Sequence, residues 1–368
     1  MNLNEMQIMV FPGKYIQGNG AINLLPDVME RYGDRAFLVA TKSMLGTVQN
    51  LMPDRGRIER FGGECSEKEI GRIKALVKDY DATVLAAIGG GKVIDCCKIV
   101  ADRLNLPVII VPTIASTDAP CSGCAVVYSD QGLYEYVYYQ KHNPDVVLID
   151  TNIISKAPVR YLISGMGDAL ATFFEANSCQ RSGSLNECGG LRTLTAMSMA
   201  RLCMDTILKY GRQAVNDSKQ GIVSDAVEAI IEANTLLSGI GFESGGLAAA
   251  HSIHNGLTKI PGTHTLYHGE KVAFGVLTGL HMIDELGLID EIYDFFIDVG
   301  LPVCFEDLGI TNITEKELVI VAESCCSEGD IMYHEPFQIK VDTLVNAMKK
   351  TDTIGKEKKS LRASMVLK

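Results

Sequence analysis

Histidines are concentrated in one segment of the chain. Residues 251–270 read HSIHNGLTKIPGTHTLYHGE and contain His251, His254, His264 and His268, whereas the whole chain has seven histidines. Neutral imidazole is the commonest nitrogen ligand of zinc and iron in proteins, so this segment can supply part of a metal site. His251 and His254 are three residues apart and share one face of a helix. Clustering alone does not distinguish a metal site from a solvated helix and loop.

A carboxylate in an apolar run suggests a further ligand. Asp168 lies in SGMGDALATFFE (residues 164–175), flanked by Met166, Ala169 and Leu170. An isolated charge is expensive to bury, so Asp168 requires a cation, either a Lys or Arg side chain or a metal ion. One Asp and two His would leave a tetrahedral zinc ion one open position, which is the arrangement of catalytic rather than structural sites.

A glycine-rich segment, Gly89-Gly90-Gly91-Lys92, follows the apolar run TVLAAI and precedes a helical pattern. Glycines let a ligand approach the backbone, and the N–H groups at a helix N-terminus attract an anion. The segment is not a Walker A loop, because Val93 stands where Ser or Thr would bind magnesium, and Ile94 replaces the third glycine of the ordinary Rossmann fingerprint. The motif predicts a pyrophosphate cradle, and a tight strand-to-helix turn is the alternative.

A hydroxyl-rich loop, VPTIASTDAP (residues 111–120), follows the next strand along the chain. Ligands of open parallel sheets bind beyond the carboxyl ends of the strands, so this loop is expected beside the glycine-rich segment. Thr113, Ser116 and Thr117 can bond a nucleotide, and Asp118 can accept from a substrate hydroxyl. Local capping of the backbone by Ser and Asp is the alternative.

Short β-branched runs alternate with amphipathic stretches over the first 150 residues. This alternation predicts a parallel sheet covered by helices on both faces, because parallel strands need crossover helices. The segment AVVYSDQGLYEYVYY (125–139) instead predicts a β-hairpin. The expected strands are 36–40, 57–61, 83–88, 108–111 and 146–149, with helices at 20–33, 43–53, 66–79 and 91–104.

The pattern becomes purely helical after residue 150. Long 3.6-residue periodicities indicate helices at 158–178, 184–212, 222–240, 244–256, 269–287, 314–327 and 340–350. The sequence therefore predicts an α/β nucleotide-binding domain over residues 1–155 and an all-α metal- and substrate-binding domain over residues 156–368, with a cleft between them.

Composition excludes several classes of protein. The formal net charge of the 368-residue chain is −11, which makes a nucleic acid partner improbable on electrostatic grounds. The chain shows neither a secretory signal nor an apolar run long enough to span a membrane, so a cytoplasmic location is expected. Its eleven cysteines include one CxxC, Cys121 to Cys124, without the second pair that a structural zinc site would need. Most are expected to be buried thiols.

Several segments together resemble one family. GGGKVIDCCK, PTIASTDAPCS, GMGDALATFFEA, FESGGLAAAHSIHNGLT and YHGEKVAFG are similar to the glycerol dehydrogenase branch of the iron-containing (group III) alcohol dehydrogenases, a superfamily that also contains dehydroquinate synthase. The likeness extends from FPGKYIQG near the N-terminus to about residue 330. It implies the dehydroquinate synthase-like fold: a Rossmann-like domain, a helical domain and the active site between them.

The resemblance also implies roles for individual residues. Asp168, His251 and His268 match the metal ligands, for zinc in this branch, while His254 matches a histidine of the substrate and nicotinamide pocket and Asp118 matches an aspartate that contacts the substrate. His264 matches no ligand. The positions that match or adjoin the nucleotide site are Gly90, Gly91, Lys92, Thr113, Ser116, Ser122, Cys124 and Tyr128.

The chain departs from the family pattern at a few positions. Thr172 stands where many iron-dependent relatives have a histidine, which favours zinc over iron. The second strand ends in Thr41-Lys42, without the usual Asp that accepts from the ribose 2′-OH of NAD. NADP is therefore an alternative to NAD as the cofactor. Gly123 and Cys124 replace other small or apolar residues and can alter the floor of the substrate pocket. The tail from Gly329 is the least family-like part.

The expected activity is zinc-dependent oxidation of glycerol and related vicinal diols to dihydroxyacetone with NAD⁺, by hydride transfer to nicotinamide. The alternatives are another polyol or alcohol dehydrogenase that uses NADP, a dehydroquinate synthase-like lyase, or a protein that only binds a nucleotide or metal. The lyase needs a cluster of basic residues, and the candidate segments offer only Lys259 and Lys271. The resemblance further implies a homo-oligomer, often an octamer.

Overall fold

The computed structural model describes residues 2–51, 56–284 and 286–366 of the chain. A six-stranded, fully parallel sheet has the order β1-β8-β5-β4-β2-β3. All five predicted strands are confirmed, and the edge strand β1 was missed because its sequence, YIQG, has no apolar run. The strands are β1 Tyr15–Gly18, β2 Ala36–Ala40, β3 Gly56–Arg60, β4 Val84–Gly89, β5 Val108–Pro112 and β8 Val146–Asp150.

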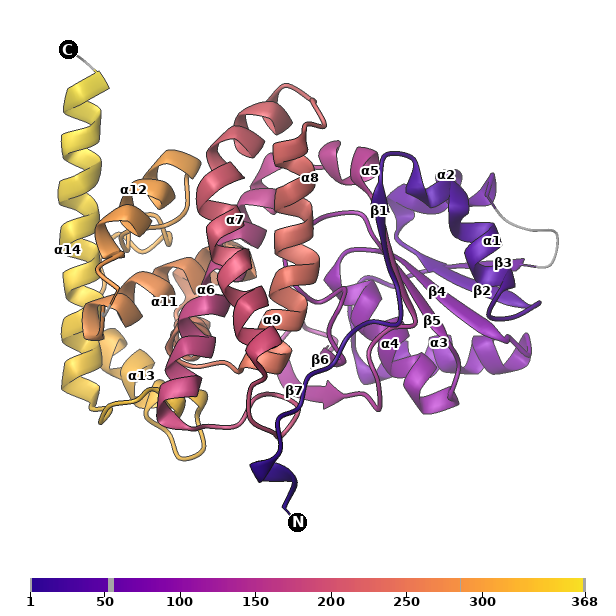
Figure 1. Cartoon of the computed structure of the whole chain (residues 1–368), viewed down its shortest axis with the longest axis horizontal. Coiled ribbons are helices and arrows are strands. Elements are labelled where there is room, and N and C mark those ends of the chain that lie inside the picture. Colours follow the sequence, from indigo (N-terminus) through magenta and orange to yellow (C-terminus); the bar gives the residue numbers. More distant parts are fainter. Residues whose placement is uncertain (1, 52–55, 285, 367–368) are drawn as a thin grey trace.

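Helices cover both faces of the sheet, as predicted (Figure 1). Successive side chains of a strand point to opposite faces, so Phe37 packs in the layer beneath α3 and α4, while Leu38 packs in the layer beneath α1 and α2. These helices are α1 Leu25–Glu30, α2 Leu45–Gln49, α3 Glu67–Asp79 and α4 Gly91–Leu104. Residues 52 and 53, at the end of the predicted helix 43–53, lie outside the described residues.

The predicted hairpin is confirmed as the antiparallel pair β6 Cys124–Tyr128 and β7 Tyr134–Tyr139, which packs on α4. After β8 the described chain is helical, as expected. The helices are α5 Thr151–Ser155, α6 Val159–Ser182, α7 Leu194–Lys219, α8 Asp225–Glu232, α9 Ser238–Gly245, α10 Ala249–Leu257, α11 His268–Met282, α12 Ile289–Val299, α13 Glu315–Cys325 and α14 Val341–Val366. Short 3₁₀ turns span Leu3–Glu5, Ala21–Leu24, Lys42–Met44, Pro261–Thr265 and Ile331–His334, and a π-helical turn spans Ala233–Leu237.

The prediction of one helix over 184–212 is wrong at its start. The Asn186 side chain accepts hydrogen bonds from the backbone N–H groups of Cys188 (3.1 Å) and Gly190 (3.0 Å), which closes a turn instead. Gly189 lies in this turn with a φ of +77°, a left-handed conformation that glycine adopts without strain. Helix α7 begins only after Thr193, whose hydroxyl caps it.

The prediction of a helix over 244–256 is also wrong at its start. Gly246 has a φ of +102° and ends α9, and α10 begins at Ala249. The region predicted as a helix over 222–240 is helical from Asp225 but contains the π-helical turn. Helix α12 was missed, and the predicted helix at 340–350 continues to Val366.

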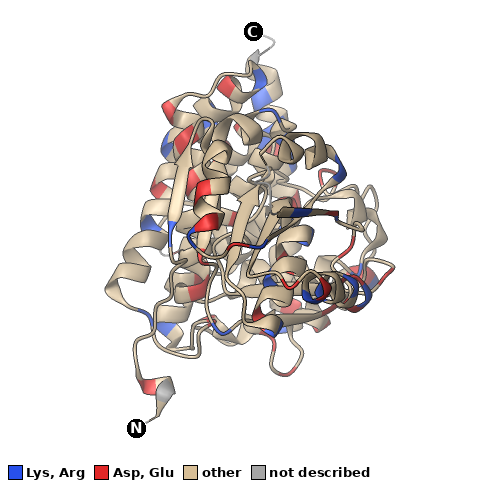
Figure 2. Cartoon of the chain, turned by 90° about the vertical axis from the view of Figure 1, so that its right-hand side faces the viewer, with Lys and Arg blue, Asp and Glu red and all other residues tan. Residues whose placement is uncertain are grey.

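The helical part is built around α6, which packs against α7, α9, α10 and α11 (Figure 1). It is tied to the sheet through β1, where the Tyr15 hydroxyl lies 3.0 Å from Thr235 Oγ1 and Gln17 Nε2 donates to Glu228 Oε2 at 2.7 Å. Lys and Arg are interspersed with Asp and Glu on the side of the chain that Figure 2 shows. No helix among the described residues is long and apolar enough to cross a membrane.

Candidate metal centre and active site

Asp168, His251 and His268 form a cluster in the helical part. Asp168 Oδ1 lies 3.3 Å from His251 Nε2 and 3.1 Å from His268 Nε2, and the three candidate ligand atoms lie within 4.8 Å of one another. Both oxygens of Asp168 are buried, and neither accepts a hydrogen bond from the described residues. Burial raises the pKa of Asp168, but the charges of His268 and His251 and the contacts with them outweigh burial, so the net effect is a lowered pKa.

Close backbone packing brings Asp168 and His268 together. A Cβ atom added to Gly269 on α11 would lie 1.9 Å from Ser164 O on α6, and one added to Gly167 would lie 2.4 Å from Gly269 O. The two helices therefore touch backbone to backbone beside both candidate ligands. The start of α11 is also anchored to α6, because Arg160 Nε and Nη2 donate to the two oxygens of Glu270 at 2.6 and 2.8 Å.

Asp118 reaches the same region from the loop after β5. Its Oδ2 accepts a hydrogen bond of 2.9 Å from Ser238 Oγ, which lies 2.9 Å from Thr172 Oγ1. Burial raises the pKa of Asp118 well above its ordinary range, and the negative charge of Asp168 raises it further. The charge of Asp168 therefore acts on Asp118, which places Asp118 near the cluster.

The loop that carries Asp118 packs closely against the helical part. Asn234 Nδ2, in the π-helical turn, donates to Ala115 O and to Leu162 O, each at 3.0 Å. A Cβ atom on Gly165 would lie 2.1 Å from Ala115 O, so the loop backbone sits directly on α6. Turns of π-helix recur at functional sites. This turn holds the loop after β5 against the helices through the bond from Asn234.

His254 lies beside the cluster without joining it. Its ring centroid is 4.2 Å from that of His268, and its Nδ1 lies 3.0 Å from Asn255 Oδ1. Burial lowers the pKa of His254 well below its ordinary range, and the charges of His268 and Lys271 lower it further. The lowered pKa favours the neutral form of the ring.

The glycine-rich segment connects β4 to α4 as predicted. Gly90 is the N-cap residue, and α4 starts at Gly91, around which a Cβ atom would meet open space. A Cβ on Gly89 would lie 2.5 Å from side-chain atoms of Thr41 and Val93. The free N–H groups at the start of this 14-residue helix therefore face an open surface at the carboxyl edge of the sheet, where a phosphate can bind.

Comparisons with known proteins identify the family. Residues 12–151 match the model of the iron-containing alcohol dehydrogenases. The chain is 46% identical over 359 residues to the glycerol dehydrogenase of Thermotoga maritima, which covers 96% of this chain and 98% of that protein. The chain belongs to the iron-containing alcohol dehydrogenase family. The crystal structure of a probable glycerol dehydrogenase from Sinorhizobium meliloti matches with a TM-score of 0.91 at 39% identity, over 96% of this chain and 99% of that chain.

The glycolaldehyde reductase of Halobacterium salinarum is 39% identical over 353 residues, which is 94% of this chain and 97% of that protein. The resemblance to glycerol dehydrogenases seen in the sequence is thereby confirmed, as is the predicted fold class. The chain is an oxidoreductase of this family, and its cluster of Asp168, His251 and His268 can hold a metal ion.

Two residues predicted to contact the nucleotide lie side by side at the family's glycine-rich loop. Lys92 Nζ lies 5.5 Å from the centre of the Tyr128 ring and donates to Glu64 Oε2 at 2.6 Å. Glu64 was not singled out in the sequence. Lys92 therefore reaches a phosphate only if it leaves or shares this carboxylate.

Other predicted nucleotide residues lie deeper. Ser122 is buried, and its hydroxyl accepts from Lys98 Nζ at 3.3 Å. Lys98 also donates to Cys124 O at 2.6 Å and Ala119 O at 2.9 Å, so this buried lysine holds the loop from within. Cys124 Sγ donates to Ser122 Oγ at 3.6 Å. Thr113 and Ser116 lie on the loop between β5 and Asp118, where Ser116 O accepts from Ser164 Oγ.

The remaining histidines lie outside the cluster. His264 Nε2 contacts Thr258 O at 2.9 Å, His281 Nε2 contacts the Tyr293 hydroxyl at 2.8 Å, and His334 Nδ1 contacts Leu247 O at 2.7 Å. These are packing contacts, and His264 is not a ligand of the cluster, as the resemblance implied. All eleven cysteines are free thiols, and most are buried.

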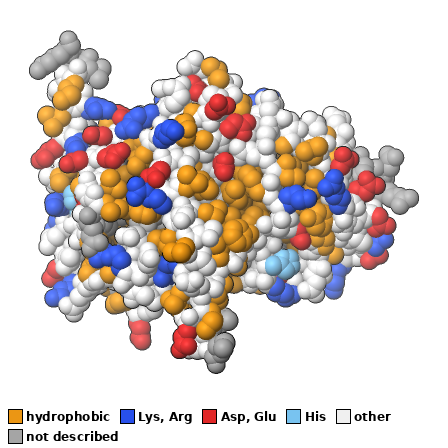
Figure 3. All heavy atoms as spheres, in the orientation of Figure 1, with side chains coloured by type: hydrophobic (Ala, Val, Ile, Leu, Met, Phe, Trp, Pro, Cys, Tyr) orange, Lys and Arg blue, Asp and Glu red, His pale blue; other side chains and the backbone are white. Residues whose placement is uncertain are grey.

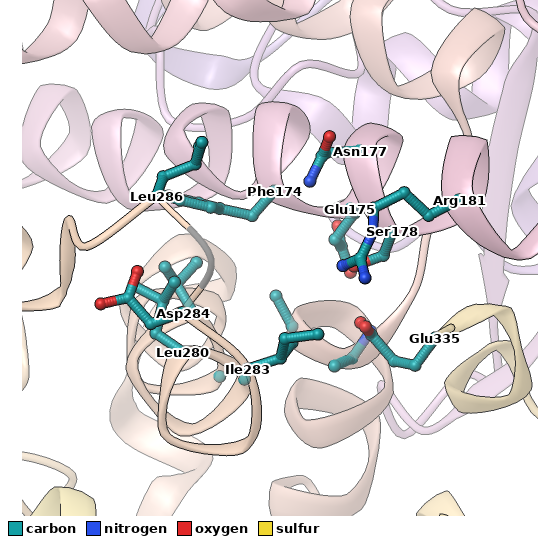
Figure 4. A pocket seen from close by; sticks show the side chains of 15 residues that line it. Phe174, Glu175, Asn177, Ser178, Arg181, Leu280, Ile283, Asp284, Leu286 and Glu335 are labelled. Carbon is teal, nitrogen blue, oxygen red and sulfur yellow. The ribbon is translucent and has the colours of Figure 1, made fainter. Parts of the chain in front are cut away.

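A pocket of about 50 Å³ lies between α6, α10 and α11 (Figure 4). It is not the candidate active site, because Asp118, Asp168, His254 and His268 are not among the described residues that line it. Its wall does contain Glu175, whose carboxylate contacts His251 Nδ1 at 2.6 Å. The sequence interpretation missed Glu175, although its position seven residues after Asp168 places both on one face of α6.

Proposed function

We propose that this chain oxidises glycerol and related vicinal diols to the ketone with NAD⁺, using a zinc ion held by Asp168, His251 and His268. The observation that carries the proposal is the unpartnered, buried carboxylate of Asp168 between two imidazole nitrogens. One carboxylate and two imidazoles form a donor set that suits zinc and leaves room for a substrate. The glycerol dehydrogenases among its relatives support the choice of substrate.

A divalent ion in this position supplies Lewis acidity, which lowers the pKa of a bound alcohol hydroxyl toward neutrality. The chain's own contribution is to place and surround that alcohol. Asp118 accepts a hydrogen bond from a substrate hydroxyl, and Ser238 holds its carboxylate in position. His254, whose ring centroid lies 4.2 Å from that of His268, belongs to the relay that carries the alcohol's proton away.

The nicotinamide cofactor supplies the hydride acceptor. We assign its pyrophosphate to the N-terminus of α4 at Gly90 and Gly91, with Lys92, Thr113, Ser116, Ser122, Cys124 and Tyr128 around the nucleotide. The short distance along the sheet edge from this helix to the Asp118 loop supports the assignment, because β4 and β5 are neighbouring strands.

NADP is the alternative cofactor. Strand β2 ends at Ala40, and Thr41 and Lys42 follow it where a carboxylate would otherwise reject a 2′-phosphate. NAD⁺ is the first choice, and parallel assays with both cofactors decide between them.

The test is a panel of glycerol, 1,2-propanediol and 2-propanol, assayed with NAD⁺ and with NADP⁺ before and after dialysis against a strong zinc chelator. We expect diol-dependent formation of the reduced cofactor, its loss after dialysis, and its return when zinc is added back. Nickel, iron and magnesium serve as control ions.

Full activity of the chelator-treated protein, with the metal shown to be absent by elemental analysis, would refute the metal-dependent mechanism. Equal rates with 2-propanol and glycerol would refute the preference for diols. Turnover only with NADP⁺ would replace the cofactor and leave the rest of the proposal intact.

A further inference from the structure

Glu175 is a buried carboxylate on α6 that contacts three donors of α10. Its Oε1 accepts from the backbone N–H groups of Ala248 and His251, both at 2.9 Å, and its Oε2 lies 2.6 Å from His251 Nδ1. The side chain is 2% exposed. A carboxylate engaged by three donors from one segment has a single orientation, so it ties the start of α10 rigidly to α6.

Helix α10 depends on such partners because it cannot cap its own N-terminus. Its N-cap residue is Ala248, which has no polar side chain. Glu335, from the C-terminal segment, supplies a second carboxylate and accepts from Ala249 N at 3.1 Å. Carboxylates at this position suit the positive end of the helix dipole when they are ionised. Only Glu175 of these two also contacts the ring of His251.

The contact with Nδ1 decides which nitrogen of His251 is available to a metal. A carboxylate accepts the Nδ1 proton, so the lone pair of the neutral ring lies on Nε2. That nitrogen faces Asp168 Oδ1 at 3.3 Å. Asp168 and Glu175 are seven residues apart, two helical turns, so one face of α6 carries both a candidate ligand and the group that orients another.

We propose that Glu175 is a positioning residue that holds His251 in the orientation and tautomer required for metal binding. The inference rests on the metal site of the proposed function, but it concerns affinity for the ion rather than turnover. Outer carboxylates that hold a metal-ligating histidine typically change metal affinity 10- to 100-fold when they are removed.

The pocket behind Glu175 supplies a matched control (Figure 4). Glu175, Ser178, Arg181 and Glu335 gather at one end of it, and Leu280, Ile283 and Asp284 lie toward the other. Glu335 lines the same pocket, is 7% exposed and bonds the same helix N-terminus. Replacing Glu335 therefore removes a buried capping carboxylate without removing a bond to His251.

The experiment compares zinc binding by wild type, Glu175→Gln and Glu335→Gln. Metal-free protein is titrated with zinc in competition with a chromophoric chelator. The zinc affinity of Glu175→Gln should fall about 10- to 100-fold. The NH₂ group of the amide would face one of the N–H donors that now bond to a carboxylate oxygen. Affinity of Glu335→Gln should change by less than about threefold, as for a helix cap alone. The visible spectrum of the cobalt-substituted protein should change for Glu175→Gln only.

Unchanged zinc affinity of Glu175→Gln would overturn the inference, and so would equal losses in both variants, which would assign the effect to capping of α10. Should Glu175→Gln fail to fold, Glu175→Asp is the second variant. It keeps the charge, but its shorter side chain moves the carboxylate away from the His251 ring. Its zinc affinity must then be lower than that of wild type. A wild-type protein that binds no zinc would refute the inference and the metal site together. A wild type that binds zinc but does not oxidise glycerol would refute only the proposed substrate.

Discussion

Buried hydroxyl and carboxylate groups connect the candidate site to distant parts of the chain. Thr172 on α6, Ser238 at the start of α9 and Asp118 on the loop after β5 form a line of two contacts, each 2.9 Å long. Because the Ser238 hydroxyl donates its one proton to Asp118 Oδ2, it accepts from Thr172. Thr172 thus takes part in holding the carboxyl group of Asp118.

Replacing Ser238 by Ala should impair catalysis without removing the metal. A hydrogen bond to a charged group contributes about 1.5–3 kcal/mol, so we expect kcat/KM for glycerol to fall about 10- to 150-fold as Asp118 loses its fixed orientation. Zinc content, measured on the same samples, should equal that of wild type.

Thr278→Val is the control for this variant. Thr278 is also buried, and its hydroxyl lies 3.2 Å from that of Thr351, far along α11 from the candidate ligands. It should lose stability but keep kcat/KM. Equal kinetics of Ser238→Ala and wild type would show that Ser238 does not orient Asp118.

At the scale of secondary-structure elements, the site depends on how closely α6 and α11 approach. Gly269 leaves no room for a side chain, because its Cβ would lie 1.9 Å from Ser164 O and 2.9 Å from Asp168 N. The glycine is therefore required by a backbone contact between helices that each carry a candidate ligand.

Replacing Gly269 by Ala should force these helices apart. Overpacking typically costs about 1–3 kcal/mol and occasionally more, so the free energy of unfolding should fall by at least that amount. Zinc affinity should fall with it, because Asp168 and His268 move apart. Denaturant unfolding of the metal-free protein and a zinc titration measure the two effects.

Gly279→Ala on the same helix is the matched control. The Cβ added there would lie 3.6 Å from Ala249 Cβ, an ordinary contact. Since Ala favours a helix interior over Gly by about 0.5–1 kcal/mol, this variant should be as stable as wild type or more stable. A Gly269→Ala protein as stable as Gly279→Ala would contradict the packing argument.

The whole molecule buries carboxyl groups in both of its parts. Asp95 lies on α4 and accepts from Val126 N of the hairpin at 3.2 Å. Burial raises its pKa to about 6, with the charge of Lys98 opposing the shift in part. Glu335 lies in the helical part, and burial raises its pKa to about 7, with bonds from Ser178 and Ala249 N opposing it. Both folded pKa values exceed the ordinary values of 3.8 and 4.5.

Because both pKa values are higher in the folded state, the folded protein binds more protons than the unfolded chain in this pH range. The stability that each group contributes is therefore complete below its ordinary pKa. It is lost as pH rises through about 6 for Asp95 and about 7 for Glu335. Relative to the Asp95→Asn/Glu335→Gln protein, wild type should lose on the order of 3 kcal/mol per group between pH 4 and pH 8. The free energy of unfolding, measured by denaturant titration across this range, tests the prediction.

Glu67→Gln provides a control of opposite sign. Its bond from Arg103 lowers the pKa of Glu67 to about 2, so the stability it contributes is present above the ordinary value and is lost as pH falls. Parallel curves for wild type and the Asp95→Asn/Glu335→Gln protein would contradict the assignment of raised pKa values.

Apolar side chains gather near the middle of the face shown in Figure 3, where the sheet meets the helical part. Large exposed apolar residues elsewhere include Leu133, Tyr134, Leu194 and Leu202. The expected homo-oligomer, the cytoplasmic location and the domain boundary at residue 155 remain predictions from the sequence.

Local sequence patterns were sufficient for much of the fold. The strands β2, β4, β5 and β8 are apolar runs bounded by turn residues, and α4 begins at the glycine that the sequence indicated. Asp168 could be recognised as requiring a cation, because burying an isolated charge is costly wherever it occurs. The motifs also indicated the family, which the comparisons confirmed.

Only the tertiary structure decided which polar groups meet. His264 and His268 are equally plausible ligands by spacing, yet the 3₁₀ turn directs His264 to Thr258 O while α11 brings His268 to Asp168. Lys92 contacts Glu64, and Glu175 contacts His251, across 28 and 76 residues of chain. Periodicity reports which face of one element is buried, but a contact between side chains depends on the packing of two elements, and that is set by the whole fold.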